Sequence, residues 1–176
     1  MKKTLLTVVA SGVLTALAGT AAADTGNISF IGEITNAACA IGGGQDGAAM
    51  TVAMGSVPAT MFAAVGDRGP QTEFVIKLIG CDTTIADTAS ISFSPAAGSV
   101  ISGRLLSLEN GMGAQGVAVG LATAAGTDIV VGGAASDYLL IDGTNELRFK
   151  AFYEATAYPV TAGSANARAV FQVDYS

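Results

Sequence analysis

The side chains that most often carry out acid–base chemistry are scarce in this sequence. It contains no histidine, the residue used most often in general acid–base catalysis. Paired carboxylates could do similar work, and Asp82 with Asp87, or Asp137 with Asp142, are formal candidates. All four lie beside turn-forming residues without signs of a buried cleft, which is typical of solvated loop carboxylates. We therefore expect no catalytic residues and no enzymatic activity.

Two glycine patterns match the G-x-G-x-x-G spacing of dinucleotide-binding loops, at residues 42–47 and 111–116. Such a loop binds pyrophosphate when a buried parallel strand precedes it and a helix N-terminus follows it. Neither pattern has these flanks, and in a chain with 23 glycines such matches arise by chance. We expect no cofactor and no small-molecule substrate.

Cys39 and Cys81 are the only cysteines of the chain. Two cysteines without histidine do not supply the four N/S ligands of structural zinc, so we expect no metal site. The pair also lacks the close Cys-x-x-Cys spacing of a redox motif. In an exported protein, an even pair of this kind indicates one structural disulfide.

The amino terminus indicates export. Lys2 and Lys3 precede an uncharged apolar run that ends in small residues, over residues 5–23. This layout is typical of a secretory signal peptide; the alternative is a membrane anchor, which needs about 20 apolar residues. The small residues at the end of the run, with no basic cluster after it, favour the signal peptide. Cleavage after Ala18 and cleavage after Ala23 both fit the local sequence.

Charge and length exclude several classes of protein. Without the two leader lysines, six basic residues face fourteen acidic ones, a net charge of −8. Such a chain lacks the Lys and Arg contacts to phosphate that dominate nucleic-acid binding. It also lacks the polybasic face that attracts proteins to anionic membranes. The mature length, about 155 residues, fits one domain.

Short segments with apolar residues at every second position predict β-strands separated by turns. Their apolar residues are Phe74, Ile76 and Leu78; Ile91 and Phe93; Val117, Val119 and Leu121; and Leu147, Phe149, Ala151 and Tyr153. Val52 and Met54 add a shorter candidate strand. Asn110-Gly111 and Asp142-Gly143 lie beside such segments and predict hairpin turns.

One short helix is predicted, with Pro58 in its first turn and residues 59–65 continuing it. Ser56 is its candidate N-cap, Pro58 suits its first turn and Gly66 its end. Many short strands with glycine-rich turns predict an antiparallel sandwich or barrel, in which this helix is a minor element.

Residues 163–176 are predicted to form one last β-strand. Ala169, Phe171, Val173 and Tyr175 alternate with more polar positions. Proteins usually protect the exposed edge of a strand with charge, proline, a bulge or a covering segment, because its backbone groups are unpaired. This segment is apolar on one face and has no proline, so the sequence predicts that something else pairs with it.

A second alternating stretch lies between the leader and Cys39. Its apolar face consists of Gly26, Ile28, Phe30, Gly32 and Ile34. The stretch could pair inside its own domain, or it could serve as a strand for another copy of the chain.

These features together resemble a type 1 fimbrial major subunit, a pilin of the chaperone–usher pathway. The resemblance rests on residues 26–39, on Cys81 with its following aspartate, on Gly163 fourteen places from the end, and on penultimate Tyr175. It implies an all-β fold, an incomplete immunoglobulin-like β-sandwich that lacks its last strand. A periplasmic chaperone would first fill the resulting groove, and the N-terminal extension of the next subunit would then replace it by β-strand addition.

The resemblance also implies roles for individual residues. Ile28 and Phe30 resemble donor residues that enter pockets, and Gly26 resembles the small donor residue that permits close approach. Cys39 and Cys81 resemble the bridging pair. The residues that resemble the groove and chaperone-recognition positions are Gly163, Phe171, Val173 and Tyr175.

The implied organisation is a signal peptide over residues 1–18, with an alternative end at 23, a donor-strand extension over 19–36 and a pilin domain over 37–176. Cleavage after Ala18 is favoured by the resemblance, because it leaves a full-length donor arm.

The implied function is that of a structural subunit of a surface fimbria, which polymerises by donor-strand exchange and supports cell adhesion. Its partners would be copies of itself, related pilins, a periplasmic chaperone and an outer-membrane usher, and it would pass through the periplasm to the cell surface. A minor or adaptor pilin of the same pathway is one alternative. A secreted monomeric β-sandwich binding domain is another.

Overall fold

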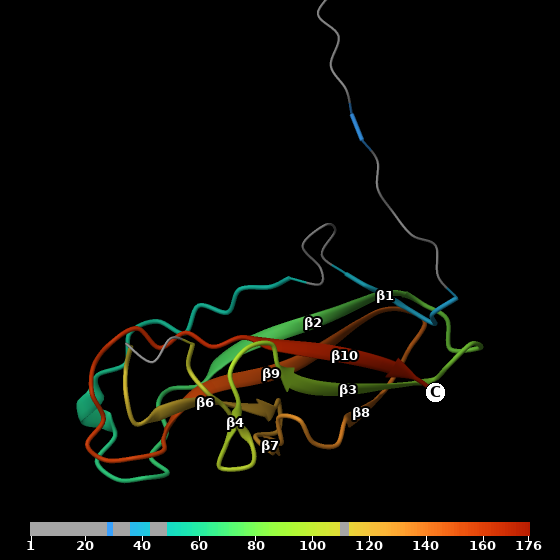
Figure 1. The fold of residues 1–176 in the computed structure, drawn as a ribbon. Helices are drawn as coiled ribbons and strands as arrows, with labels where there is room; N and C mark the ends of the chain where they lie inside the picture. Colours follow the sequence, from blue (N-terminus) through green and yellow to red (C-terminus); the bar gives the residue numbers. More distant parts are fainter. Residues whose placement is uncertain (1–27, 30–35, 43–48, 110–112) are drawn as a thin grey trace, which may run out of the picture. The chain divides into compact units, whose positions relative to one another are not determined.

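The computed structural model describes residues 28–29, 36–42, 49–109 and 113–176 (Figure 1). The chain divides into two units, residues 1–34 and 35–176. In the first unit, Ile28 and Ser29 are described and both are exposed. The predicted signal peptide, Gly26 and Phe30 lie outside the described residues. No helix in the described part of the chain is long and apolar enough to cross a membrane.

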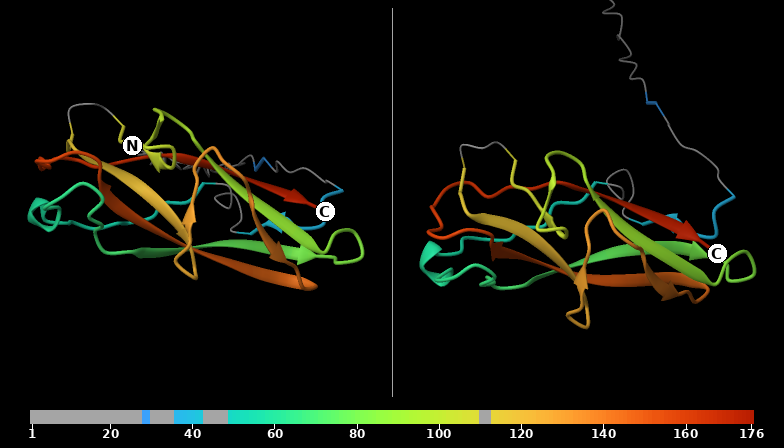
Figure 2. Two further views of the ribbon diagram at one scale, coloured as in Figure 1. Left: turned by 90° about the horizontal axis from the view of Figure 1, so that it is seen from below. Right: turned by 60° about the horizontal axis from the view of Figure 1, so that its bottom comes forward.

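The described residues of the second unit form two antiparallel sheets, as the alternating segments predict (Figure 2). The larger sheet has the order β1-β2-β9-β6-β5-β4, with β7 paired to β6, and the smaller has the order β10-β3-β8. The strands of the larger sheet are β1 (Ala40–Ile41), β2 (Thr72–Cys81), β4 (Val100–Ile101), β5 (Leu105–Leu106), β6 (Val117–Thr123), β7 (Asp128–Ile129) and β9 (Gly143–Ala155). Those of the smaller sheet are β3 (Thr88–Pro95), β8 (Ser136–Leu139) and β10 (Ala169–Tyr175).

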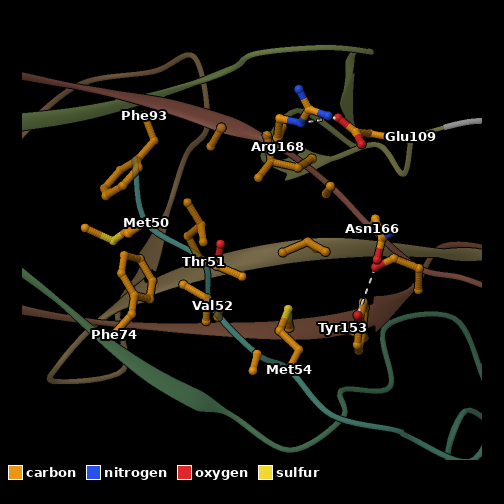
Figure 3. A pocket seen from close by; sticks show the side chains of 18 of the residues that line it. Met50, Thr51, Val52, Met54, Phe74, Phe93, Glu109, Tyr153, Asn166 and Arg168 are labelled. Atoms are coloured by element: carbon orange, nitrogen blue, oxygen red, sulfur yellow. Dashed lines mark hydrogen bonds and ion pairs between the residues drawn. The ribbon is translucent and has the colours of Figure 1, made fainter. Parts of the chain in front are cut away.

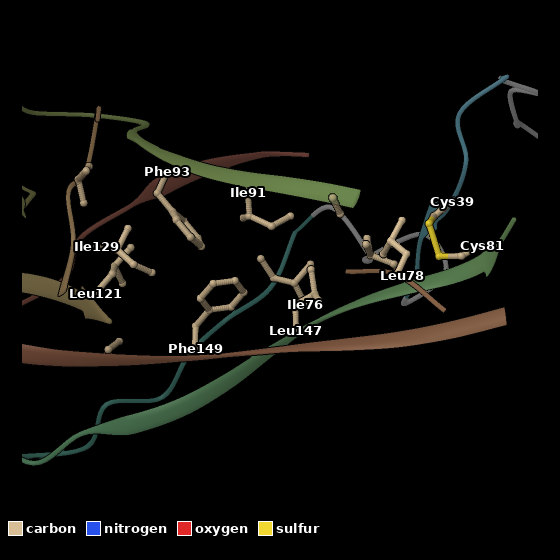
Figure 4. Close-up of a cluster of buried hydrophobic side chains, with 14 of the residues drawn as sticks. Cys39, Ile76, Leu78, Cys81, Ile91, Phe93, Leu121, Ile129, Leu147 and Phe149 are labelled. Carbon is tan, nitrogen blue, oxygen red and sulfur yellow. A yellow bond between two sulfur atoms is a disulfide. The ribbon is translucent and has the colours of Figure 1, made fainter. Parts of the chain in front are cut away.

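The core lies between the facing sides of the two sheets (Figure 4). Phe149 of β9 is fully buried at its centre. Its ring stacks on Phe74 of β2 at 5.5 Å and meets Phe93 of β3 edge-on at 5.2 Å between ring centroids. Aromatic pairs in these geometries contribute about 0.5–1.5 kcal/mol beyond the area they bury. The aromatic cluster therefore fixes how the sheets face each other.

A disulfide joins Cys39 to Cys81 at one end of the sandwich (Figure 4). Cys39 directly precedes β1, and Cys81 is the last residue of β2. Both are buried. The bond therefore anchors the start of the second unit to the end of a central strand.

The outer side of β9 carries a partly exposed ion cluster around the buried Glu154. Arg68 donates two hydrogen bonds to the Asp128 carboxylate, at 2.9 and 2.6 Å, and one to Glu154 at 2.8 Å. Arg104 also pairs with both carboxylates. The Arg68 guanidinium lies 4.6 Å from the ring centroid of Phe152. Because Glu154 is only 6% exposed, its charge requires these partners.

The predicted helix is wrong. The chain forms a single 3₁₀ turn, η2 (Ala59–Met61). The Asp67 carboxylate accepts hydrogen bonds from the N–H groups of Ala63 and Ala64, at 2.7 and 2.8 Å. A continuing helix would direct these two donors to carbonyl groups of the preceding turn. The N-cap residue is Pro58 rather than the expected Ser56, and it makes no side-chain capping bond.

The hairpin predicted at Asp142-Gly143 is also wrong, because β8 and β9 belong to different sheets. The Asp142 carboxylate instead accepts hydrogen bonds from the backbone N–H and hydroxyl of Thr83, at 2.8 and 2.7 Å. These bonds lower the pKa of Asp142. The connection between β8 and β9 therefore crosses from one sheet to the other, and its Asp142 is bonded to Thr83 in the turn after β2. The turn predicted at Asn110-Gly111 lies outside the described residues.

The turn between β6 and β7 is a tight, exposed loop. Thr123 donates its N–H to the carbonyl of Thr127 at 2.9 Å, and the N–H of Gly126 bonds the Thr123 carbonyl at 2.9 Å. The loop residues between them, 124–126, are fully on the surface.

Candidate functional site: an open groove beside the terminal strand

The last strand is shorter than predicted. β10 covers Ala169–Tyr175, whereas residues 163–168 have no strand partner. Its neighbour β3 ends at Pro95, which faces Ala169 in the ladder. The earlier residues turn to another part of the chain instead: the Asn166 carbonyl accepts a hydrogen bond from the Glu109 N–H at 2.7 Å. The ladder therefore stops where β3 stops.

One edge of β10 is bonded to β3 and the other is open among the described residues. Ser176 and Thr88 exchange two backbone hydrogen bonds, each of 3.1 Å. Bonded and non-bonded pairs alternate in an antiparallel ladder, so Asp174 and Gln172 also direct their backbone groups toward β3. The N–H and C=O groups of the residues between them point the opposite way. These residues are Ala169, Phe171, Val173 and Tyr175.

The same alternate residues turn their side chains inward. Phe171, Val173 and Tyr175 are partly buried and pack against the core, whereas Gln172 and Asp174 are exposed. Burial raises the pKa of the Tyr175 phenol. The open edge thus combines free backbone groups with a half-covered apolar face.

Residues 50–57 form the opposite side of the opening. They have the alternation predicted for a strand, with Val52 and Met54 partly buried between exposed neighbours. The predicted strand is nevertheless absent, because these residues make no backbone hydrogen bond to any described residue. The segment has the side-chain pattern of a strand but lacks a backbone partner.

Between these two edges lies a cavity of about 680 Å³ (Figure 3). Its floor contains the core aromatic side chains Phe74 and Phe93. One wall is formed by residues 50–55, and the other by 165–169 with Phe171. The surroundings are mainly apolar, so the cavity suits apolar side chains.

Polar contacts are confined to one part of the cavity. Arg168, which is largely exposed, forms an ion pair with Glu109, with 2.9 Å between its Nε and a carboxylate oxygen (Figure 3). The Tyr153 hydroxyl donates to the Ala165 carbonyl at 2.8 Å. These contacts hold residues 165–168 against the sheets and keep the wall of the cavity in place.

A second cavity of about 350 Å³ continues the first. The two share Gly55, Tyr153, Ala165 and Asn166 in their linings, so they form one groove. Gly163 lines the second cavity, and a Cβ at this position would lie 2.5 Å from the backbone nitrogen of Ala114. Its lack of a side chain permits this close approach.

The candidate carboxylates do not form a site of their own. Asp137 accepts a hydrogen bond from the Ser90 hydroxyl at 2.7 Å, and Asp82 one from the Thr84 hydroxyl at 2.6 Å. None of Asp82, Asp87, Asp137 and Asp142 lines either cavity. Among the described residues, no group of three potential ligands could hold a metal ion.

The structure thus brings together three of the expected groove residues, Phe171, Val173 and Tyr175, on one strand, with Gly163 further along the same groove. Of the expected donor residues, Ile28 is described and is 78% exposed. The wall formed by residues 50–55 was not predicted as part of the site, although the alternation of Val52 and Met54 was its signal.

Comparison with known proteins gives a consistent result. The family model described as "Fimbrial protein" matches residues 28–176. "Fimbrial subunit type 1" of Salmonella typhimurium is 35% identical over 183 residues, covering 98% of each chain. "Type-1 fimbrial protein, A chain" of Escherichia coli (strain K12) is 36% identical over 181 residues, again covering 98% of each. A solved chaperone–usher pilus structure, described in terms of rod uncoiling, has a TM-score of 0.72 at 26% identity and covers 90% of this chain and 100% of its own.

Proposed function

This chain belongs to the fimbrial protein family and is a structural subunit of a surface fimbria rather than an enzyme, and we propose that its groove receives the N-terminal arm of the next copy. The arm is residues 19–36, released by cleavage after Ala18, and the receiving domain is residues 37–176. Successive copies then join head to tail into a filament.

The open groove between β10 and residues 50–57 is the observation that carries this proposal. Each side presents a backbone edge without a partner among the described residues. A strand inserted between them would pair with the free N–H and C=O groups of Phe171, Val173 and Tyr175. Each such backbone bond contributes about 0.5–1.5 kcal/mol net. This is recognition by β-strand addition, in which backbone pairing supplies affinity and alternate side chains supply specificity.

The inserted side chains would be Ile28 and Phe30, two residues apart on one face of the arm. The cavity of about 680 Å³, lined by Phe74, Phe93 and Phe171, offers an apolar environment for them. Burying an aliphatic or aromatic side chain of this size contributes about 1.5–3 kcal/mol. Gly26 would lie further along the arm, where a small residue lets the backbones approach closely.

A periplasmic chaperone would occupy the groove before the arm does, and an outer-membrane usher would direct the exchange. An unpaired strand edge beside an apolar cavity is prone to aggregation, so a subunit in transit needs a temporary partner. The half-buried ring of Tyr175, at the end of the open edge, is a suitable element for such a chaperone to recognise.

The arrangement explains why a filament forms rather than a closed dimer. The arm and the groove are different surfaces of one chain, so each contact leaves one free arm and one free groove. Head-to-tail contacts that do not close produce open polymers. We assign the chain to the shaft of the fimbria, where one repeating subunit is required.

Substitution Phe30→Arg tests the proposal. A charge entering an apolar pocket is unpaired and costly, so assembly into fibres should be lost while the chaperone-bound subunit accumulates normally. The matched control is Ser29→Arg, which places the same charge on the other face of the arm and should assemble. Fibre yield and co-purification with the chaperone give the two readouts. Normal assembly of Phe30→Arg would show that the arm is not the donor.

Mass spectrometry of sheared fibres separates the shaft subunit from a minor or adaptor pilin. A shaft subunit should be the main component and should begin at Gly19. A low proportion of this chain would favour the minor pilin. Deleting the arm up to Phe30 separates the monomeric alternative, because a monomeric domain would lose stability, whereas a fimbrial subunit would still bind its chaperone.

A further inference from the structure

Exposed apolar side chains gather at the disulfide end of the sandwich. Four of them form what we call the disulfide-end patch, with exposed fractions between 40% and 83%. They are Ile79, Ile85, Leu139 and Ile141. Isolated exposed apolar residues are ordinary, but a group at one end of a domain indicates an interaction surface.

Three connections link the segments that carry Ile85, Leu139 and Ile141. The Asp142 carboxylate binds Thr83, which joins the turn carrying Ile85 to the connection carrying Ile141. The Leu140 N–H donates to the Asp87 carbonyl at 2.8 Å. Leu139 faces Thr88 in the ladder between β8 and β3. These three side chains therefore lie on segments that are fixed to one another, and Ile79 lies near the end of β2, two residues before Cys81.

A second group of exposed apolar side chains lies at the other end of β9. Met61, Val65 and Tyr158, which we call the opposite-end patch, have exposed fractions of 46%, 64% and 66%. Gly66 donates its N–H to the carbonyl of Ala155, the last residue of β9, at 2.8 Å. The thirteen residues of β9 span about 40 Å at about 3.3 Å per residue, which separates the two patches.

The place where the arm leaves the domain indicates what covers the disulfide-end patch. The arm ends at Asn36, three residues before Cys39, whose disulfide holds it at this end. Three residues of extended chain reach at most about 11 Å. If the whole arm, up to Asn36, lies in the groove of the next copy, that copy therefore lies against the disulfide end. This step rests on the proposed function.

The direction of the inserted arm indicates which part of the next copy is met. Every strand pair in the described residues is antiparallel. An arm antiparallel to β10 would have its C-terminal end beside Ala169, where β10 begins. The groove continues from there along Gly163 and Ala162 toward the end of the sandwich that carries the opposite-end patch.

We propose that the disulfide-end patch of one copy packs against the opposite-end patch of the next copy, forming a second contact at every junction of the fibre. The arm supplies the affinity of the junction. It also tethers the two patches at a high effective concentration, so a small apolar contact is enough to stay closed. The contact then fixes the angle between consecutive subunits, which a single strand in a groove would leave free.

Crosslinking tests the contact. A Leu139→Cys/Val65→Cys chain, assembled into fibres and treated with a short bismaleimide, should give a ladder of covalent oligomers on a denaturing gel. Crosslinking within one chain is excluded by the length of β9. The control is Val130→Cys/Val65→Cys, because Val130 is also an exposed apolar residue, at 47%, but lies outside both patches. A ladder in the first fibre and none in the control supports the contact. Fibres without a ladder, or an equal ladder in the control, overturn it.

A second variant tests the same contact without cysteines. Leu139→Asp/Ile141→Asp changes two exposed side chains, so the subunit should fold and fibres should form, but electron micrographs should show a loss of stiffness. Unchanged stiffness would contradict the proposal. Failure of the end contact can be told apart from failure of the proposed donor arm. Fibres that need Phe30 but show neither crosslinks nor softening would contradict the end contact alone. Fibres that form from Phe30→Arg would contradict the donor arm.

Discussion

Truncation of Phe171 should weaken the fibre more than it weakens the isolated subunit. The side chain is half-buried in the described structure and lines the larger cavity. Insertion of a donor arm would cover the remaining half. Phe→Ala at a fully buried site costs about 3–5 kcal/mol. About half of this, near 2 kcal/mol, should be lost from the unfolding free energy of the isolated subunit. A further loss of similar size should appear only in the assembled fibre, where the donor arm covers the other half of the ring.

A loss of about 2 kcal/mol at each junction corresponds to about a thirtyfold change in the dissociation constant. The assay is the release of subunits from purified Phe171→Ala fibres in graded guanidinium chloride, compared with unfolding of the isolated subunit. Gln172→Ala is the matched control, because its side chain points outward and bonds only its neighbour Asp174, at 2.9 Å. Control fibres should dissociate like the parent.

Two outcomes would refute this reasoning. If Gln172→Ala fibres were as weak as Phe171→Ala fibres, the inward face of β10 would not be the one that the donor covers. If Phe171→Ala lowered the unfolding free energy of the isolated subunit by the full amount of about 3–5 kcal/mol and weakened the fibre by no additional amount, the cavity would not be an acceptor groove.

Three further predictions concern the body of the domain. The hydrogen bonds from Arg68 lower the pKa of Asp128, so its contribution to stability is present at neutral pH and is lost as the pH falls below about 3.8. Asp128→Asn should therefore unfold more easily than the parent at pH 7 in urea, with the difference vanishing in acid. Replacing Cys39 and Cys81 with serine should lower the unfolding free energy by about 4 kcal/mol, measured as a shift in the denaturant midpoint. Gly163→Ala should reduce fibre yield, because its Cβ would meet the Ala114 backbone at 2.5 Å; a normal yield would show that the groove tolerates displacement there.

The sequence was sufficient to predict the strands whose side chains alternate between core and solvent. β9 is the clearest example, because Leu147, Phe149 and Ala151 are all buried. β6, in which every residue except Thr123 is buried, was also predicted, from the alternation of Val117, Val119 and Leu121. On its other face Gly120 leaves room for Phe152 of the neighbouring strand. Periodicity therefore identifies strands even where the burial itself does not alternate.

Local signals failed at two places, for different reasons. The helix predicted after Pro58 ends after one turn because Asp67 takes its next backbone donors. Asp142-Gly143 has the composition of a hairpin turn, but Thr83 binds the aspartate and the chain crosses between sheets. Only the second outcome depends on a residue that is distant in the sequence, since Thr83 lies 59 residues before Asp142.

The sequence predicted one side of the candidate groove and not the other. The alternation in β10 indicated an apolar face on an exposed edge, but the other wall of the groove depends on residues 50–57 lying far from it in sequence. Their alternation suggested a strand, and the structure gives them no backbone partner. The failure of that prediction is informative, because a strand-like segment without a ladder marks the place of a missing strand.

The turn between β6 and β7 has a practical use. Its exposed residues 124–126 are flanked by Thr123 and Thr127, and the N–H of Thr123 bonds the carbonyl of Thr127 at 2.9 Å, so this closing bond uses no group of the loop itself. Exposed loop tips of this kind are where insertions are best tolerated. The turn contributes no residue to the groove or to either end patch. A peptide epitope inserted there would be repeated once per subunit, which would make the fibre a scaffold for dense antigen display.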